Sequence, residues 1–164
     1  MGRAGSVGDE LGSALIGARL VRDLMRLCFQ MEREYAPYPK WFGTAFKQLE
    51  AAPTLTPHLR AALGSETWQE RDSHLAPAYE LVAAKHNALG LTEQLPERVR
   101  DFFGRPFKVI ALHGFADALL KQITDAKVQR IARRRPIGSL DQFSDSTDLV
   151  SHSRWRPTLR KLYE

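Results

Sequence analysis

The chain has 164 residues, of which 43% are hydrophobic and 26% are charged, and its formal net charge is +5. This composition is ordinary for a soluble globular protein, and the length is enough for one domain with a core of its own. Its apolar runs fall short of the roughly 18 residues that span a bilayer, and the first ten residues lack the apolar segment of a signal peptide. We therefore expect no membrane partner.

The single cysteine, Cys28, rules out an intrachain disulfide and fits a cytoplasmic protein. The charge is uneven. Residues 1–126 hold 15 basic and 15 acidic residues, whereas residues 127–164 hold nine basic and four acidic ones, so the whole excess lies in the last segment. A basic segment can bind phosphate or an acidic partner, although a solvated surface is the simpler interpretation.

Residues 9–35 are predicted to form one long helix that ends before Pro37. Its apolar positions recur at three- and four-residue steps, namely Leu11, Leu15, Ala18, Val21, Met25 and Cys28. A second stripe, formed by Leu20, Leu24, Leu27 and Met31, predicts that two sides of this helix are covered.

Residues 35–46 contain five aromatic residues and two prolines. The prolines require a turn, and the aromatic side chains predict that it is held against a core. A second helix is expected from Pro39 or Lys40 to Ala51. It should bury Trp41, Phe42, Ala45, Phe46 and Leu49.

Three helix signals follow in the middle of the chain. Thr56-Pro57 is a cap and first-turn pair for a short helix that ends at Gly64. Residues 67–70 match a capping box for the next helix, which Pro77 should kink or restart and which Gly90 should end.

Pro96 is predicted to open another helix, with Val99, Phe102 and Phe103 inward. Residues 107–110 form the only plausible strand, which has no evident partner. Three further helices are expected: one over residues 115–123, one that begins after a cap at Asp125, and one over residues 155–163. Residues 136–153 read as an ordered loop. The sum is one all-α domain, 1–164, a bundle of about seven helices.

Several motifs resemble a bacterial domain-of-unknown-function family, number 4037. They are residues 8–13, 18–28, 35–46, 86–90, 103–107 and 137–148, within a resemblance that covers most of residues 5–150. In that family the helical part usually follows a nucleotidyltransferase-like core. The resemblance implies that this chain is the C-terminal part of a longer protein. It further implies that it covers such a core, in the same or another chain, and helps to bind substrate.

The segment from Gly138-Ser139 to Asp148 is the nearest approach to a catalytic motif. Nucleotidyltransferases use a Gly-Ser turn followed by Asp-x-Asp on a strand, so that both carboxylates reach one magnesium ion. Here Asp141, Asp145 and Asp148 have the wrong spacing, and no apolar strand carries them. We therefore expect no complete active site, and either a locally hydrogen-bonded loop or a loop that reaches toward a missing core.

Other candidate substrate-binding residues each have a structural alternative. His86 and Asn87 end a helix, where a histidine can satisfy the last carbonyls. Arg105 could bind an anion or brace a loop. Tyr38, Lys40 and Trp41 could stack on a nucleobase and bind phosphate, or form a core cluster with a lysine at its edge.

Nucleic-acid binding is the leading alternative function. Its candidate residues are Arg133, Arg134 and Arg135, and we expect such binding to be weak. A purely structural interaction domain, such as a homo-oligomer, is the third hypothesis. The histidines show no metal-ligand spacing, so we expect no metal and no cofactor.

Overall fold

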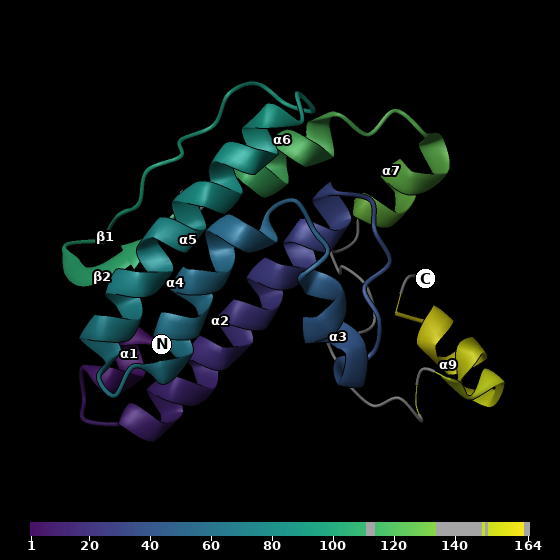
Figure 1. Cartoon of the computed structure of the whole chain (residues 1–164). Coiled ribbons are helices and arrows are strands. Elements are labelled where there is room, and N and C mark those ends of the chain that lie inside the picture. The colour runs from purple at the N-terminus through teal and green to yellow at the C-terminus, as the bar shows by residue number, and fades with distance from the viewer. Residues whose placement is uncertain (111–113, 134–148, 150, 163–164) are drawn as a thin grey trace.

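The protein is represented by a computed structural model, which describes residues 1–110, 114–133, 149 and 151–162. Long helices α2 (Glu10–Met31), α4 (Ala52–Gly64) and α5 (Trp68–Ala88) lie side by side (Figure 1). Short helix α1 (Gly2–Gly5) adjoins α2 and α5, and α3 (Pro39–Phe46) lies near the end of α2. The fold is thus broadly helical.

The expectation of an all-α fold was wrong in one region. Strands β1 (Arg100–Phe102) and β2 (Arg105–Val109) form a two-stranded antiparallel hairpin where a helix was predicted from Pro96. The turn residues Phe103 and Gly104 have φ of 48° and 73°. This left-handed pair suits a hairpin turn and cannot occur inside a helix. Phe103 is exposed rather than inward.

Helix α2 confirms the long-helix prediction but ends four residues early. The Arg33 and Glu34 amides donate to the Gln30 and Phe29 carbonyls at 3.2 and 2.9 Å, and Arg33 has φ of 59°. This is a Schellman motif with arginine at the left-handed position that glycine usually occupies. The helix is therefore closed by its own backbone, ahead of Pro37.

Helix α4 starts before the predicted Thr56-Pro57 pair because its cap comes from a distant residue. The Glu32 carboxylate accepts hydrogen bonds from the Glu50 and Ala51 amides at 2.7 and 3.0 Å. Pro57 therefore lies inside α4. The predicted end at Gly64 is confirmed.

Helix α5 confirms the capping box. The Thr67 hydroxyl accepts a hydrogen bond from the Glu70 amide, and the Glu70 carboxylate accepts one from the Thr67 amide. The helix runs through Pro77 without a restart. It ends as predicted before Gly90, whose φ is 63°. Arg71 of α5 is buried and bonds to Ser13 of α2 at 2.8 Å and to the Ser65 carbonyl at 2.9 Å.

The core lies between α2, α4 and α5. Its buried residues are Val21, Leu24, Cys28, Phe29, Phe46, Leu49, Ala51, Ala52, Leu55, Leu59, Ala62, Leu75, Ala78 and Val82. Phe29 contacts the rings of Phe42 and Phe46, with ring centroids 5.3 and 6.3 Å away. Leu11 and Leu15, which were predicted to be inward, are exposed.

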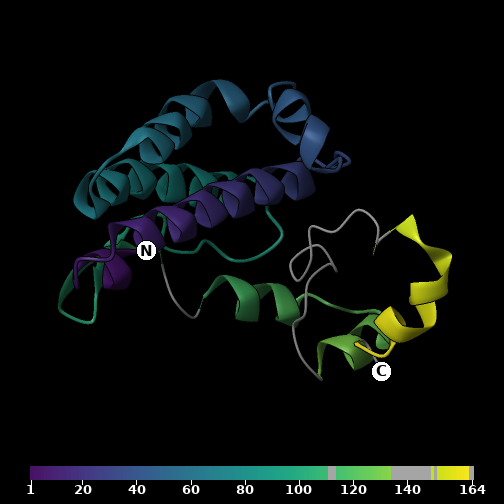
Figure 2. The ribbon, with the colours of Figure 1, turned by 90° about the horizontal axis from the view of Figure 1, so that it is seen from below.

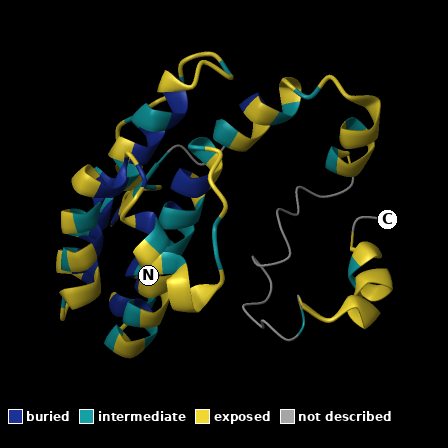
Figure 3. Cartoon of the chain, turned by 45° about the vertical axis from the view of Figure 1, so that its right-hand side comes forward, coloured by how far each residue is buried: buried dark blue, intermediate teal, exposed yellow. Residues whose placement is uncertain are grey.

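The second apolar stripe of α2 faces α6 (Phe115–Lys121), but α6 covers it only in part, because Leu27 remains exposed. Figure 2 shows α4 and α6 on opposite sides of the pair formed by α2 and α5. Beyond α6 come α7 (Ala126–Ala132), the 3-10 turn η2 (Ser153–Trp155) and α9 (Arg156–Arg160). Asp125 caps α7 as predicted. Neither α7 nor α9 holds a buried residue, and both are mostly exposed in Figure 3.

Candidate functional site

The aromatic turn forms only part of the core cluster that we expected. Phe46 is buried, but Trp41 is 51% exposed and Tyr38 is 47% exposed. The Lys40 ammonium lies 5.3 Å from the centroid of the Trp41 ring. Because α3 is short and meets the core along one side, its first turn is left on the surface. Tyr38, Lys40 and Trp41 thus form an exposed aromatic and cationic patch.

Asn87 holds the segment that follows α5. Its side-chain amide donates to the Leu95 carbonyl at 2.8 Å and to Glu97 at 2.7 Å, and its carbonyl accepts from the Leu95 amide at 3.0 Å. All of its polar atoms are therefore used in bracing a loop. This geometry favours the structural interpretation of Asn87.

His86 contacts the same segment and α6. It is 8% exposed, and its Nε2 lies 3.1 Å from the Thr92 hydroxyl. Its ring meets the Phe115 ring edge to face, with centroids 4.9 Å apart. The His86 ring therefore contacts Thr92 and α6, and it lies in a hollow between α5 and α6.

Arg105 is exposed on β2, where its guanidinium lies 5.9 Å from the Phe102 ring centroid. Arg133 is exposed at the end of α7. Asp141, Asp145, Asp148, Arg134 and Arg135 lie outside the described residues, and so does most of the predicted 136–153 loop. The described candidates do not meet in one place.

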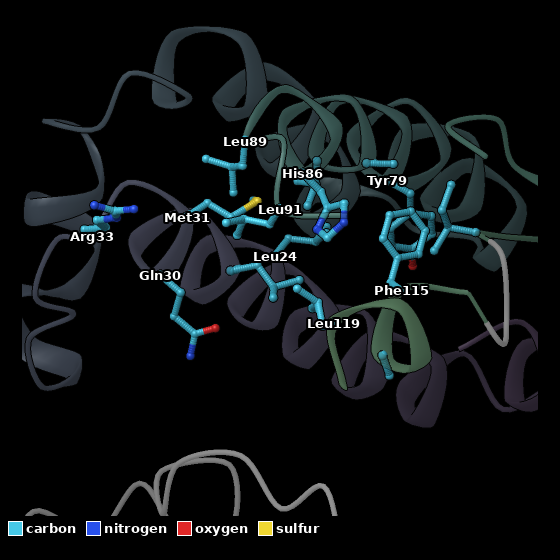
Figure 4. A pocket seen from close by; sticks show the side chains of 15 residues that line it. Leu24, Gln30, Met31, Arg33, Tyr79, His86, Leu89, Leu91, Phe115 and Leu119 are labelled. Carbon is cyan, nitrogen blue, oxygen red and sulfur yellow. The ribbon is translucent and has the colours of Figure 1, made fainter. Parts of the chain in front are cut away.

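An apolar groove lies between α2, α5 and α6, and His86 is part of it (Figure 4). Its volume is about 530 Å³, within the range of small-molecule pockets. It is lined by Leu24, Leu27, Gln30, Met31, Arg33, Tyr79, Val82, Ala83, His86, Leu89, Leu91, Ile110, Phe115, Ala116 and Leu119. We call this set the α2–α6 groove.

Much of the apolar lining of the α2–α6 groove remains in contact with solvent. Leu27, Leu89, Leu91 and Leu119 are each more than a third exposed. Leaving large apolar side chains in water is unfavourable, so contiguous exposed apolar surface often marks a binding site. The groove is therefore the strongest candidate site in the described part of the chain.

Four polar residues are distributed along the α2–α6 groove. Arg33 lies at one end beside Gln30, and His86 lies between them and Tyr79 (Figure 4). Burial, with a smaller effect from the nearby Asp72 charge, raises the pKa of the Tyr79 phenol, so it stays protonated at neutral pH. Among the described residues that line the groove, Arg33 is the only one with a fixed charge, and none is acidic.

A second, more polar hollow lies behind the aromatic turn, with a volume of about 640 Å³. Glu32 and Lys85 meet in it, with the Lys85 ammonium 3.0 Å from the Glu32 carboxylate. Although burial alone would raise it, the Lys85 bond and the Glu50 and Ala51 amides hold the pKa of Glu32 below its usual value. These groups are already paired with each other, so the hollow offers less binding capacity than the α2–α6 groove.

Cys28 is fully buried in the core, as predicted. Burial, assisted by the Glu32 charge, raises the pKa of its thiol to about 11. A protonated, inaccessible thiol is a poor nucleophile. Among the described residues there is no group of three His, Cys, Asp or Glu side chains that could hold a metal ion.

Of the candidate site residues predicted from the sequence, His86 alone is among the described residues that line the α2–α6 groove. The signal that could have revealed the rest was the second apolar stripe of α2, with Leu24, Leu27 and Met31. This stripe predicted a covering element but did not predict that the cover would be incomplete. In the described part of the chain, none of the helices has the length and hydropathy needed to cross a membrane.

Residues 1–42 match the family described as "Domain of unknown function (DUF4037)". The match confirms the resemblance over residues 1–42, and the motifs noted at residues 86–90, 103–107 and 137–148 lie outside it. It contains α1, α2 and the start of α3, and so includes the α2 wall of the groove and the exposed Tyr38, Lys40 and Trp41. No curated protein and no solved structure matches the chain.

Proposed function

We propose that this chain is the accessory or substrate-binding helical part of a bacterial, cytoplasmic nucleotidyltransferase-like protein, and that it is not catalytic alone. One observation carries the proposal: the α2–α6 groove is open, largely apolar and of ligand size. Such a site favours binding over chemistry, because its described lining offers one imidazole and no carboxylate. The family match at residues 1–42 supports the resemblance from which this context is inferred.

The test is complex formation with a nucleotidyltransferase-like core encoded in the same genome, measured by analytical size exclusion and calorimetry. Leu119→Asp introduces a charge into the α2–α6 groove and should weaken the complex at least tenfold. Leu63→Asp is the matched control, because Leu63 is 56% exposed on α4, across the α2–α5 pair from α6. Equal loss in both variants, or no complex with any such core, would contradict the proposal.

A basic nucleic-acid-binding module is the second candidate, favoured by two exposed cation–aromatic pairs. Lys40 lies over Trp41, and the Arg154 guanidinium lies 5.4 Å from the Trp155 ring centroid. Aromatic faces of this kind can stack on bases. We expect weak, sequence-independent binding that falls steeply with salt, because it depends on counterion release.

Fluorescence anisotropy at low and physiological salt tests this second candidate. Replacing Arg133, Arg134 and Arg135 with alanine should remove most of the binding at low salt. Tight, sequence-selective binding that survives physiological salt would make nucleic-acid recognition the main function instead. A homodimer that buries the α2–α6 groove, seen by sedimentation, would favour the third hypothesis, a structural interaction domain.

A further inference from the structure

We propose that the ligand of the α2–α6 groove is a small amphipathic anion, with an aliphatic body and one carboxylate-like end. This inference rests on the substrate-binding part of the proposed function, since it names the class of ligand that the same groove would present to the core. It follows from the shape of the groove, the distribution of its polar groups and the unusual backbone position of Arg33.

The body of the ligand is defined by the apolar lining. Eleven of the fifteen lining residues are apolar, contributed by α2, α5, α6, the segment after α5 and Ile110. Each methylene group moved from water into such a site contributes favourably to binding. A flexible alkyl chain fits this lining of leucine, methionine and valine side chains better than a polar ligand such as a nucleotide. The α2–α6 groove is therefore suited to a chain of several methylene groups.

The charge of the ligand is defined by Arg33. Within the described part of the chain, its guanidinium forms no hydrogen bond or ion pair. No acidic side chain among the described lining residues neutralises it. Arg33 is exposed at the end of the groove, and a guanidinium binds carboxylates in a bidentate manner. An anion at the Arg33 end and an alkyl chain toward Tyr79 would satisfy both features.

The backbone at Arg33 argues that the side chain has a role of its own. Its φ of 59° places it at the left-handed position of the motif that closes α2. Glycine occupies this position with less strain than a residue that carries a Cβ atom. Arginine is thus an unfavourable residue for the local fold and a favourable one for an anion at the end of the groove.

The same feature provides a clean experiment. Arg33→Gly should keep or raise the melting temperature, because it relieves the backbone, while it removes the cation. Binding of decanoate and of its uncharged counterpart 1-decanol is measured by calorimetry at pH 7.5, where decanoate is ionised. We expect the chain to bind decanoate with a micromolar Kd, Arg33→Gly to weaken it about tenfold, and 1-decanol binding to be unchanged by Arg33→Gly.

Two further variants complete the test. Leu119→Asp should weaken both ligands, and Leu63→Asp should weaken neither. The inference is overturned if decanoate does not bind saturably, if Arg33→Gly affects both ligands equally, or if sedimentation shows that a second copy occupies the groove. Failure of decanoate binding with an intact complex between the chain and a nucleotidyltransferase-like core would reject the ligand class alone and leave the proposed function standing.

Discussion

At the scale of single residues, the aromatic turn shows that the position of a residue within a helix decides whether its side chain is buried. Phe46 and Trp41 belong to the same helix and have similar hydrophobic character, yet Phe46 is 3% exposed and Trp41 is 51% exposed. A composition rich in aromatic residues predicts contact with a core, but it does not say which rings make that contact. The spacing of five residues between the two puts them on different faces of α3.

The contrast between these two residues is directly testable. Phe46→Ala should lower the free energy of unfolding by about 3–5 kcal/mol, because it leaves a cavity beside Phe29. Trp41→Ala should cost less than about 1 kcal/mol, as expected for a surface position. Urea unfolding measures both, and similar losses in the two variants would show that Trp41 is a core residue after all.

Glu32 predicts a dependence of stability on pH. The pKa of Glu32 in the folded state lies below the ordinary 4.5. The contribution of Glu32 to the free energy of unfolding is therefore complete above about pH 4.5 and is lost as the pH falls through the folded-state pKa. Glu32→Gln should therefore be less stable than the parent at pH 7 by about 1–3 kcal/mol, the loss expected for charge-assisted bonds. The difference should narrow in acid. Unfolding curves at several pH values measure it, with the exposed neighbour Glu34→Gln as control; a difference that stays constant with pH would refute the role of Glu32.

At the scale of elements, local signals were readable where the cap or turn residues lie next to the element. The capping box at Thr67, the stop at Gly90 and the cap at Asp125 were all found from neighbouring residues. The start of α4 was missed because its cap is the Glu32 carboxylate, at the end of α2. The hairpin was missed because Phe103 adopts a positive φ that its residue type does not suggest.

The capping box of α5 provides a prediction at this scale. Thr67→Ala removes the hydroxyl that accepts a hydrogen bond from the Glu70 amide, and it should lower the free energy of unfolding by about 1 kcal/mol. Thr67→Ser retains an oxygen at the same place and should lie close to the parent. Thermal unfolding compares the two, and equal stability of the alanine and serine variants would mean that the cap contributes nothing.

At the scale of the whole molecule, the α2–α6 groove arises from how α6 sits on the α2–α5 pair. The covered side of α2 was predictable from its second apolar stripe, whereas the incomplete cover was not. Leu27 of α2 and Leu119 of α6 remain 45% and 41% exposed although they line the same hollow. Such a gap depends on where a distant helix comes to rest, and helical periodicity carries no information about that.

The central claim is that the α2–α6 groove, rather than the α3 patch or the basic C-terminal segment, is the binding surface. Hydrogen–deuterium exchange with and without a nucleotidyltransferase-like core tests it most directly, because exchange reports on every segment at once. Protection is expected in peptides covering residues 24–33, 79–91 and 115–121, with residues 38–41 and 153–160 unchanged. Protection confined to residues 38–41 or 153–160, with residues 115–121 unaffected, would contradict the claim.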